Sequence, residues 1–168
     1  LKIWTKVDYS VQAMAKTLEH VDMIKQGKNL PAPESLNQSW QHQIQGYHLV
    51  DTLPGTMLAF DMGTGKTKVI VDYVANKKPN RVLVCCPKAV VNIWPDEFAK
   101  HCSLPRTDYI IAALNGRSVE KRAEYANKML DLARARGCAL VIICNYEAAW
   151  RGRMGQFISG IKWDLVVA

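Results

Sequence analysis

Several short segments of the chain are apolar at almost every position. They are residues 81–86 (RVLVCC), 108–114 (DYIIAAL), 139–144 (ALVIIC) and 163–168 (WDLVVA). A strand that is covered on one face alternates apolar and polar residues, whereas a strand that is covered on both faces is apolar throughout. Helical patterns separate these segments, which predicts right-handed crossovers between parallel strands. The sequence therefore predicts an α/β fold, a three-layer sandwich with a mainly parallel sheet.

The segments between the predicted strands carry helical patterns. Residues 117–136 repeat apolar residues at helical spacing, and this seam consists of Val119, Ala123, Ala126, Leu130 and Ala133. Further helices are expected at residues 67–76, at 88–101 with Pro95 starting a second short helix, and around 147–158. We expect these helices to cover both faces of the sheet.

A different pattern precedes the α/β region. Residues 9–26 predict an amphipathic helix that Gly27 ends, with an apolar stripe made of Val11, Met14, Leu18, Val21 and Ile24. Residues 28–38 are rich in Pro, Asn and Ser and predict a linker, and residues 39–52 predict another helix. We therefore expect an N-terminal accessory helix and linker over residues 1–38 and one domain over residues 39–168.

Composition narrows the classes of function. The chain has 168 residues and a formal net charge of +7. A basic balance favours anionic partners such as nucleic acid, although many domains simply carry surplus lysines. The five cysteines form no C-x-x-C pair, which argues against a zinc site and favours a reducing, intracellular setting. The longest apolar runs are too short to span a membrane.

One glycine-rich stretch has the composition of a phosphate-binding loop. It reads Gly63-Thr64-Gly65-Lys66-Thr67, and it follows a predicted strand at residues 56–60. Glycines permit backbone angles that turn successive N–H groups towards an anion, and the N-terminus of the following helix adds a positive pole. Lys66 would bind the β- and γ-phosphates, and the hydroxyl of Thr67 would bind Mg²⁺. A surface turn with an incidental lysine is the alternative.

The same stretch departs from the general phosphate-loop pattern. That pattern places a glycine where this chain has Phe60. The stretch LAFDMGTGKT nevertheless resembles the first helicase motif of the Swi/Snf family in superfamily 2, which reads close to LADEMGLGKT and also lacks this glycine. The matching residues are Met62, Gly63, Gly65, Lys66 and Thr67. The resemblance implies a RecA-like P-loop NTPase that binds ATP and Mg²⁺ with residues 62–67, Thr64 included.

A second stretch of the same resemblance lies upstream of the loop. Residues 40–47 (WQHQIQGY) resemble the family's Q motif, which is close to RPYQLEGL. The resemblance implies that Gln43 reads adenine, because a side-chain amide can both donate to and accept from the adenine edge. A solvated helix residue is the alternative for Gln43.

Two later stretches resemble motifs that lie against nucleic acid in this family. Residues 84–98 (VCCPKAVVNIWPDEF) resemble motif Ia, which implies that Lys88 lies near phosphate. Residues 141–147 (VIICNYE) resemble motif Ib, with Asn145 in place of the usual Ser, and an amide can also contact a phosphate. A solvated lysine is the alternative for Lys88.

The last residues of the sequence, 163–168, resemble the strand that leads into the Asp-Glu pair of motif II. The resemblance thus implies a partial first helicase lobe. It further implies that the acidic pair and a second RecA-like lobe come from the rest of a parent protein, of phage or bacterial type. On this interpretation the 168 residues bind ATP but do not turn it over alone.

The resemblance implies an ATP hydrolase that couples hydrolysis to movement on, or remodelling of, nucleic acid, with duplex DNA as the expected partner. No membrane partner is expected. The expected location is intracellular, in the cytoplasm or nucleoid, or in the host cytoplasm for a phage protein. Two alternatives stay open: another P-loop enzyme such as a kinase, and a nucleic-acid-binding protein that does not hydrolyse ATP. The basic helix predicted at residues 117–136 is compatible with the second.

Overall fold

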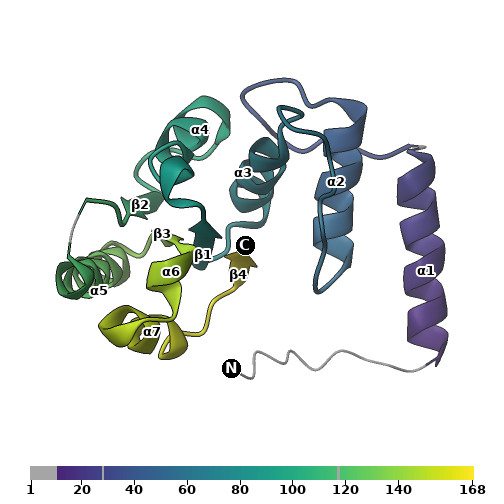
Figure 1. Ribbon diagram of the computed structural model, residues 1–168. Helices are drawn as coiled ribbons and strands as arrows, with labels where there is room; N and C mark the ends of the chain where they lie inside the picture. The colour runs from purple at the N-terminus through teal and green to yellow at the C-terminus, as the bar shows by residue number, and fades with distance from the viewer. Residues whose placement is uncertain (1–10, 28, 117) are drawn as a thin grey trace. The chain divides into compact units, whose positions relative to one another are not determined.

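The computed structural model describes residues 11–27, 29–116 and 118–168, with the side chains of residues 11–13 and 119 left out (Figure 1). Parts of three predictions therefore lie outside the described residues: the helix start at residues 9 and 10, the linker residue 28, and residue 117. The chain forms two compact units. One consists of the described residues up to 77 together with 101–103, and the other of the described residues in 78–100 and 104–168.

A parallel sheet of four strands forms the centre of the second unit. Its strands are β1 (Arg81–Cys86), β2 (Tyr109–Ala113), β3 (Ala139–Asn145) and β4 (Leu165–Val167), in the spatial order β2-β3-β1-β4. Every residue of β3 is buried, as a central strand covered on both faces requires. The predicted parallel sheet and its strands are confirmed, with bounds that differ by up to two residues at each end.

Helices cover both faces of this sheet. On one face, α5 (Val119–Arg136) and α7 (Gly152–Ser159) pack with the strands in a buried cluster that includes Leu83, Leu130 and Ile142. On the other face, Phe98 of α4 (Trp94–His101) packs against Tyr109 of β2, with ring centroids 5.9 Å apart. Figure 1 shows α4 on one side of the strands and α5 with α7 on the other. The predicted three-layer arrangement is confirmed.

The ends of α5 follow helix-capping rules. The Ser118 hydroxyl accepts a hydrogen bond from the N–H of Lys121 at the start, and Gly137 adopts a left-handed conformation at the end with φ of +62°. The predicted seam residues Ala123, Ala126 and Leu130 are buried. The short helices η1 (Lys88–Val90) and α6 (Tyr146–Ala149) follow β1 and β3 directly. They occupy the carboxyl ends of these two strands.

The first unit contains α1 (Val11–Gln26), α2 (Gln41–Thr52) and α3 (Lys66–Lys77). Side-chain amides of α2 fasten the end of α1: Gln41 donates to the carbonyl of Gly27, and Gln45 donates to the carbonyl of Ile24. Residues 29–38 contain no helix or strand, as predicted for a linker. Among the described residues, no helix is long and apolar enough to cross a bilayer.

The apolar stripe predicted for α1 is buried only in part. Val21 and Ile24 are buried, but 51% of Met14 and 62% of Leu18 are exposed. The predicted helix is therefore confirmed, whereas its apolar stripe is buried only at the end of α1, where α2 contacts it. The amide contacts from Gln41 and Gln45 lie at this end of α1, next to the buried Ile24.

The predicted strand at residues 56–60 is wrong, since none of these residues forms a strand. The apolar side chains of this segment pack on a helix instead. A Cβ placed at Gly46 of α2 would lie 2.8 Å from Phe60 Cζ and 3.4 Å from Leu58 Cδ2, so both side chains lie directly on the α2 backbone. Met57, directly before Leu58, is 89% exposed. Leu58 and Phe60 are thus partly buried on α2 without a strand partner.

Candidate nucleotide site

The glycine loop lies between the extended segment that ends at Phe60 and the first turn of α3. Gly63 and Gly65 have φ of +78° and +87°, in the region that glycine adopts without steric cost. Thr64 closes the turn, because its hydroxyl donates to the carbonyl of Asp61 at 2.7 Å. The helix then begins at Lys66, and Val69 N–H donates to the carbonyl of Gly65. Loop amides and a helix N-terminus are therefore brought together, as a phosphate site requires.

The ammonium of Lys66 folds back over the loop. Its Nζ donates to the carbonyl of Phe60 at 2.7 Å and to the carbonyl of Asp61 at 3.0 Å. These contacts place the positive charge at the mouth of the loop that Gly63 and Gly65 shape. Because both acceptors are neutral carbonyls, a phosphate oxygen would be a stronger partner for the same ammonium.

Gln43 connects α2 to the loop. Its Oε1 accepts a hydrogen bond from Trp40 N–H at 3.0 Å, and its Nε2 donates to the carbonyl of Thr64 at 2.9 Å. Only 6% of the residue is exposed. A Cβ at Gly65 would overlap this amide nitrogen, so the loop backbone approaches Gln43 as closely as glycine allows. The solvated alternative for Gln43 is thereby wrong.

Two neighbours of Gln43 support the same contact. His42 Nε2 lies 2.9 Å from the Thr64 carbonyl, which accepts a hydrogen bond when the ring proton is on this nitrogen. The ring of Phe60 packs edge-on against His42, with centroids 5.2 Å apart and an interplanar angle of 89°. Phe60, which replaces an acid of the family pattern, therefore holds the histidine that contacts the loop.

A buried ion pair in α3 is a feature that sequence reasoning missed. Lys68 Nζ lies 2.6 Å from Asp72 Oδ2, and it also donates to the hydroxyls of Ser35 and Ser39 at 3.0 and 2.7 Å. Both charged side chains are almost fully buried. The Asp72 Oδ1 atom is buried and has no hydrogen-bond partner among the described residues. Spacing of four residues inside an apolar helix was the available signal for this pair.

This ion pair fastens the segment before α2 to the helix after the loop. Asn76 adds two further contacts, since its side chain accepts from Glu34 N–H at 3.0 Å and donates to the Glu34 carbonyl at 2.9 Å. The network begins two residues after Lys66. It therefore fixes the helix that carries Lys66.

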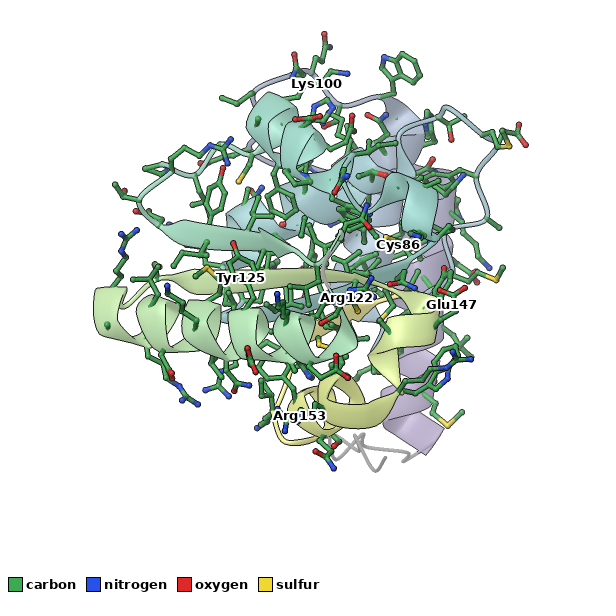
Figure 2. All side chains as sticks on the ribbon, turned by 60° about the vertical axis from the view of Figure 1, so that its left-hand side comes forward. Cys86, Lys100, Arg122, Tyr125, Glu147 and Arg153 are labelled. Atoms are coloured by element: carbon green, nitrogen blue, oxygen red, sulfur yellow. The ribbon has the colours of Figure 1, made fainter. Side chains whose placement is uncertain are left out.

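The two nucleic-acid candidates lie in the second unit. Lys88 is exposed in η1. The Asn145 side chain is buried. Its amide oxygen accepts a hydrogen bond from Arg122 Nη1 at 3.3 Å, and its amide nitrogen donates to Glu147. Figure 2 labels Arg122 and Glu147. The hydrogen bond from Asn145 lowers the pKa of Glu147, and the nearby charges of Arg151 and Lys88 lower it further. Asn145 is therefore already paired, whereas Lys88 faces solvent.

The loop residues fit a nucleotide phosphate in their chemistry. Nothing lies within 4 Å of a Cβ built at Gly63, so this side of the loop is open.

The fit of the described residues to a magnesium ion is less complete than their fit to a phosphate. Among the described residues, no group of three or more His, Cys, Asp or Glu side chains could hold a metal. A magnesium ion would therefore rely on Thr67 together with phosphate oxygens and water, which is the usual arrangement for this ion.

We predict that Asp72→Asn lowers the free energy of unfolding by about 3 kcal/mol or more, because the Lys68 charge would stay buried without a counter-charge. Urea denaturation measures this change. The control is Asp51→Asn, which breaks the half-exposed Asp51–Lys77 pair at 2.8 Å and should cost about 1 kcal/mol or less. Equal costs for the two variants would contradict the prediction.

Comparison with known proteins connects this geometry to a family. Residues 12–168 match the SNF2-related domain, so most of the predicted accessory segment lies inside the matched region. No curated protein matches the chain significantly. The SNF2-related domain is the ATPase lobe of Swi/Snf-type, helicase-like translocases. With its parallel sheet and its glycine loop before α3, the chain belongs to the SNF2 family of ATPases.

Proposed function

We propose that residues 43 and 62–67 bind ATP with Mg²⁺ and that the parent protein uses its hydrolysis to move along duplex DNA or to remodel a DNA complex. The observation that carries the proposal is the loop geometry. Gly63 and Gly65 have positive φ directly before the N-terminus of α3, with the Lys66 ammonium over the same loop. Phosphoryl transfer needs mainly positioning and charge neutralisation, and these are what such a loop supplies.

Each residue of the loop has a proposed role. The N–H groups of residues 62–65, Met62 included, cradle the phosphates, and Lys66 exchanges its carbonyl partners for the β- and γ-phosphates. Thr67 supplies a hydroxyl to Mg²⁺. Gln43 contacts the adenine edge. Its hydrogen bond to the Thr64 carbonyl also connects it to the loop. Because both ends of its amide are paired in the structure, reading adenine requires exchange of its bond to Trp40 or to Thr64.

The remaining catalytic groups are proposed to come from elsewhere in the parent protein. In this proposal, acidic residues that follow β4 orient water and metal, and an arginine of a second RecA-like lobe stabilises the transition state. The 168 residues alone are then expected to bind nucleotide without appreciable turnover. We also propose an intracellular location, since DNA is the proposed partner.

Duplex DNA is proposed as the nucleic acid because of the net charge of +7 and the exposed Lys88 at the carboxyl end of β1. Lys88 is proposed to contact a backbone phosphate. Asn145 is the weaker candidate for a direct contact, because its amide is held by Arg122 and Glu147.

Replacing the loop lysine tests nucleotide binding. Lys66→Ala should weaken binding of a fluorescent ADP analogue by about 10- to 100-fold, because a charge-assisted hydrogen bond contributes about 1.5–3 kcal/mol. Lys77→Ala is the matched control, since Lys77 lies at the far end of the same helix and pairs with Asp51. Equal affinities for Lys66→Ala and the unsubstituted chain would refute the proposed phosphate site.

Salt titration of DNA binding tests the second part of the proposal. Lys88→Ala should reduce the slope of log affinity against log salt concentration by about 1 for duplex DNA, as expected for one lost phosphate contact. Lys128→Ala, on the exposed side of α5, is the control and should leave the slope unchanged. A slope that falls with Lys128→Ala but not with Lys88→Ala would instead assign nucleic-acid binding to the basic helix α5.

A further inference from the structure

Two cysteine thiols face each other where strands β1 and β3 approach their carboxyl ends. Cys85 and Cys144 are register partners in these paired parallel strands, and their Sγ atoms lie 3.9 Å apart. Both side chains lie on the face of the sheet that α5 and α7 cover. Nothing in the proposed nucleotide chemistry uses them.

The two thiols differ in environment. Cys144 is fully buried, whereas Cys85 is only half-buried. The hydrogen bond with Cys144 lowers the pKa of Cys85, and the same contact together with burial raises the pKa of Cys144. Cys85 therefore loses its proton more readily than Cys144 does. This division matches an attacking thiol beside a resolving thiol.

Backbone geometry permits a covalent bond between the two residues. Neighbouring strands lie about 4.8 Å apart, and disulfides join residues whose Cα atoms are about 4.4–6.8 Å apart. The Sγ atoms need to close from 3.9 Å to a bond of about 2.05 Å. Each cysteine is the penultimate residue of its strand, so the adjustment falls next to a strand end and not in the middle of the ladder.

We propose that Cys85 and Cys144 form an oxidisable dithiol site that reacts with low-molecular-weight disulfides and closes to a covalent link between β1 and β3. In the first step the Cys85 thiolate attacks the small disulfide, forms a mixed disulfide and releases one small thiolate. That thiolate takes the proton of Cys144. The Cys144 sulfur then attacks the Cys85 sulfur and releases the second small thiolate, so two protein thiols are oxidised and one small disulfide is reduced.

The link would lie directly before the segments proposed to contact DNA. Cys85 is followed closely by Lys88 in η1, and Cys144 by Asn145 and Glu147. An effect of oxidation on DNA affinity rests on the proposed function, but the oxidation itself does not. The proposed oxidation can therefore fail while the proposed function holds, and the proposed function can fail while the oxidation holds.

The test treats the whole chain with oxidised glutathione, counts free thiols after removing the reagent, and maps the linked peptides without reduction. All five cysteines are reduced in the structure, with no disulfide among them. We expect three to remain, with one peptide pair joined through Cys85 and Cys144. Cys86→Ser is the matched control, because Cys86 neighbours Cys85 in sequence but points to the other face of the sheet, where its sulfur contacts Trp94 and lies 3.8 Å from the Cys144 carbonyl. It should leave the linked pair intact.

Cys85→Ser should abolish the linked peptide, and Cys144→Ala should instead trap a mixed disulfide on Cys85. The peptide map of the unsubstituted chain shows whether Cys85 and Cys144 are linked even if one of these variants folds poorly. Five free thiols after treatment, a stable mixed disulfide on Cys85 of the unsubstituted chain, or a link through Cys86 would each overturn the proposal. Nucleotide binding enters none of these readouts.

Discussion

The backbone carbonyl of Thr64 is the point at which the glycine loop is attached by hydrogen bonds to the helix that precedes it. Side-chain nitrogens of Gln43 and His42 both lie 2.9 Å from this oxygen. A loop of this kind has few contacts of its own, because its glycines have no side chains to pack. Its conformation therefore depends on its contacts with side chains of α2. The close approach of Gly65 to Gln43 shows why a side chain is not tolerated there.

The buried Lys68–Asp72 pair holds the other side of the loop. It joins the first turns of α3 to Ser35 and Ser39, which lie in the segment before α2. Hydrogen bonds from both hydroxyls satisfy the ammonium, which limits the cost of burying its charge. Polar contacts on both sides of the loop therefore position it, and they join residues that are tens of positions apart in the sequence. Long-range polar contacts of this type favour one arrangement over others more than they add stability.

Much of the second unit was predictable from its residues, because its strands are apolar at almost every position and the seam of α5 repeats apolar residues at helical spacing. The segment at residues 56–60 was not predictable in this way. Short apolar runs do not reveal whether they pair with a strand or pack on a helix. Here Leu58 and Phe60 pack on Gly46. In the site, Lys66 and the two glycines follow from local spacing, whereas the contacts of Gln43, His42 and Asp72 depend on tertiary structure.

The central claim is that residues 63–66 receive a phosphate group through their backbone amides. The most direct measurement is a two-dimensional amide NMR titration of the chain with ADP and Mg²⁺. We expect the largest shifts at the N–H groups of Gly63, Gly65 and Lys66, with smaller shifts at the Gln43 side-chain amide as its bond to Thr64 adjusts. Amides of this loop that stay unshifted at saturating nucleotide, while residues elsewhere respond, would contradict it.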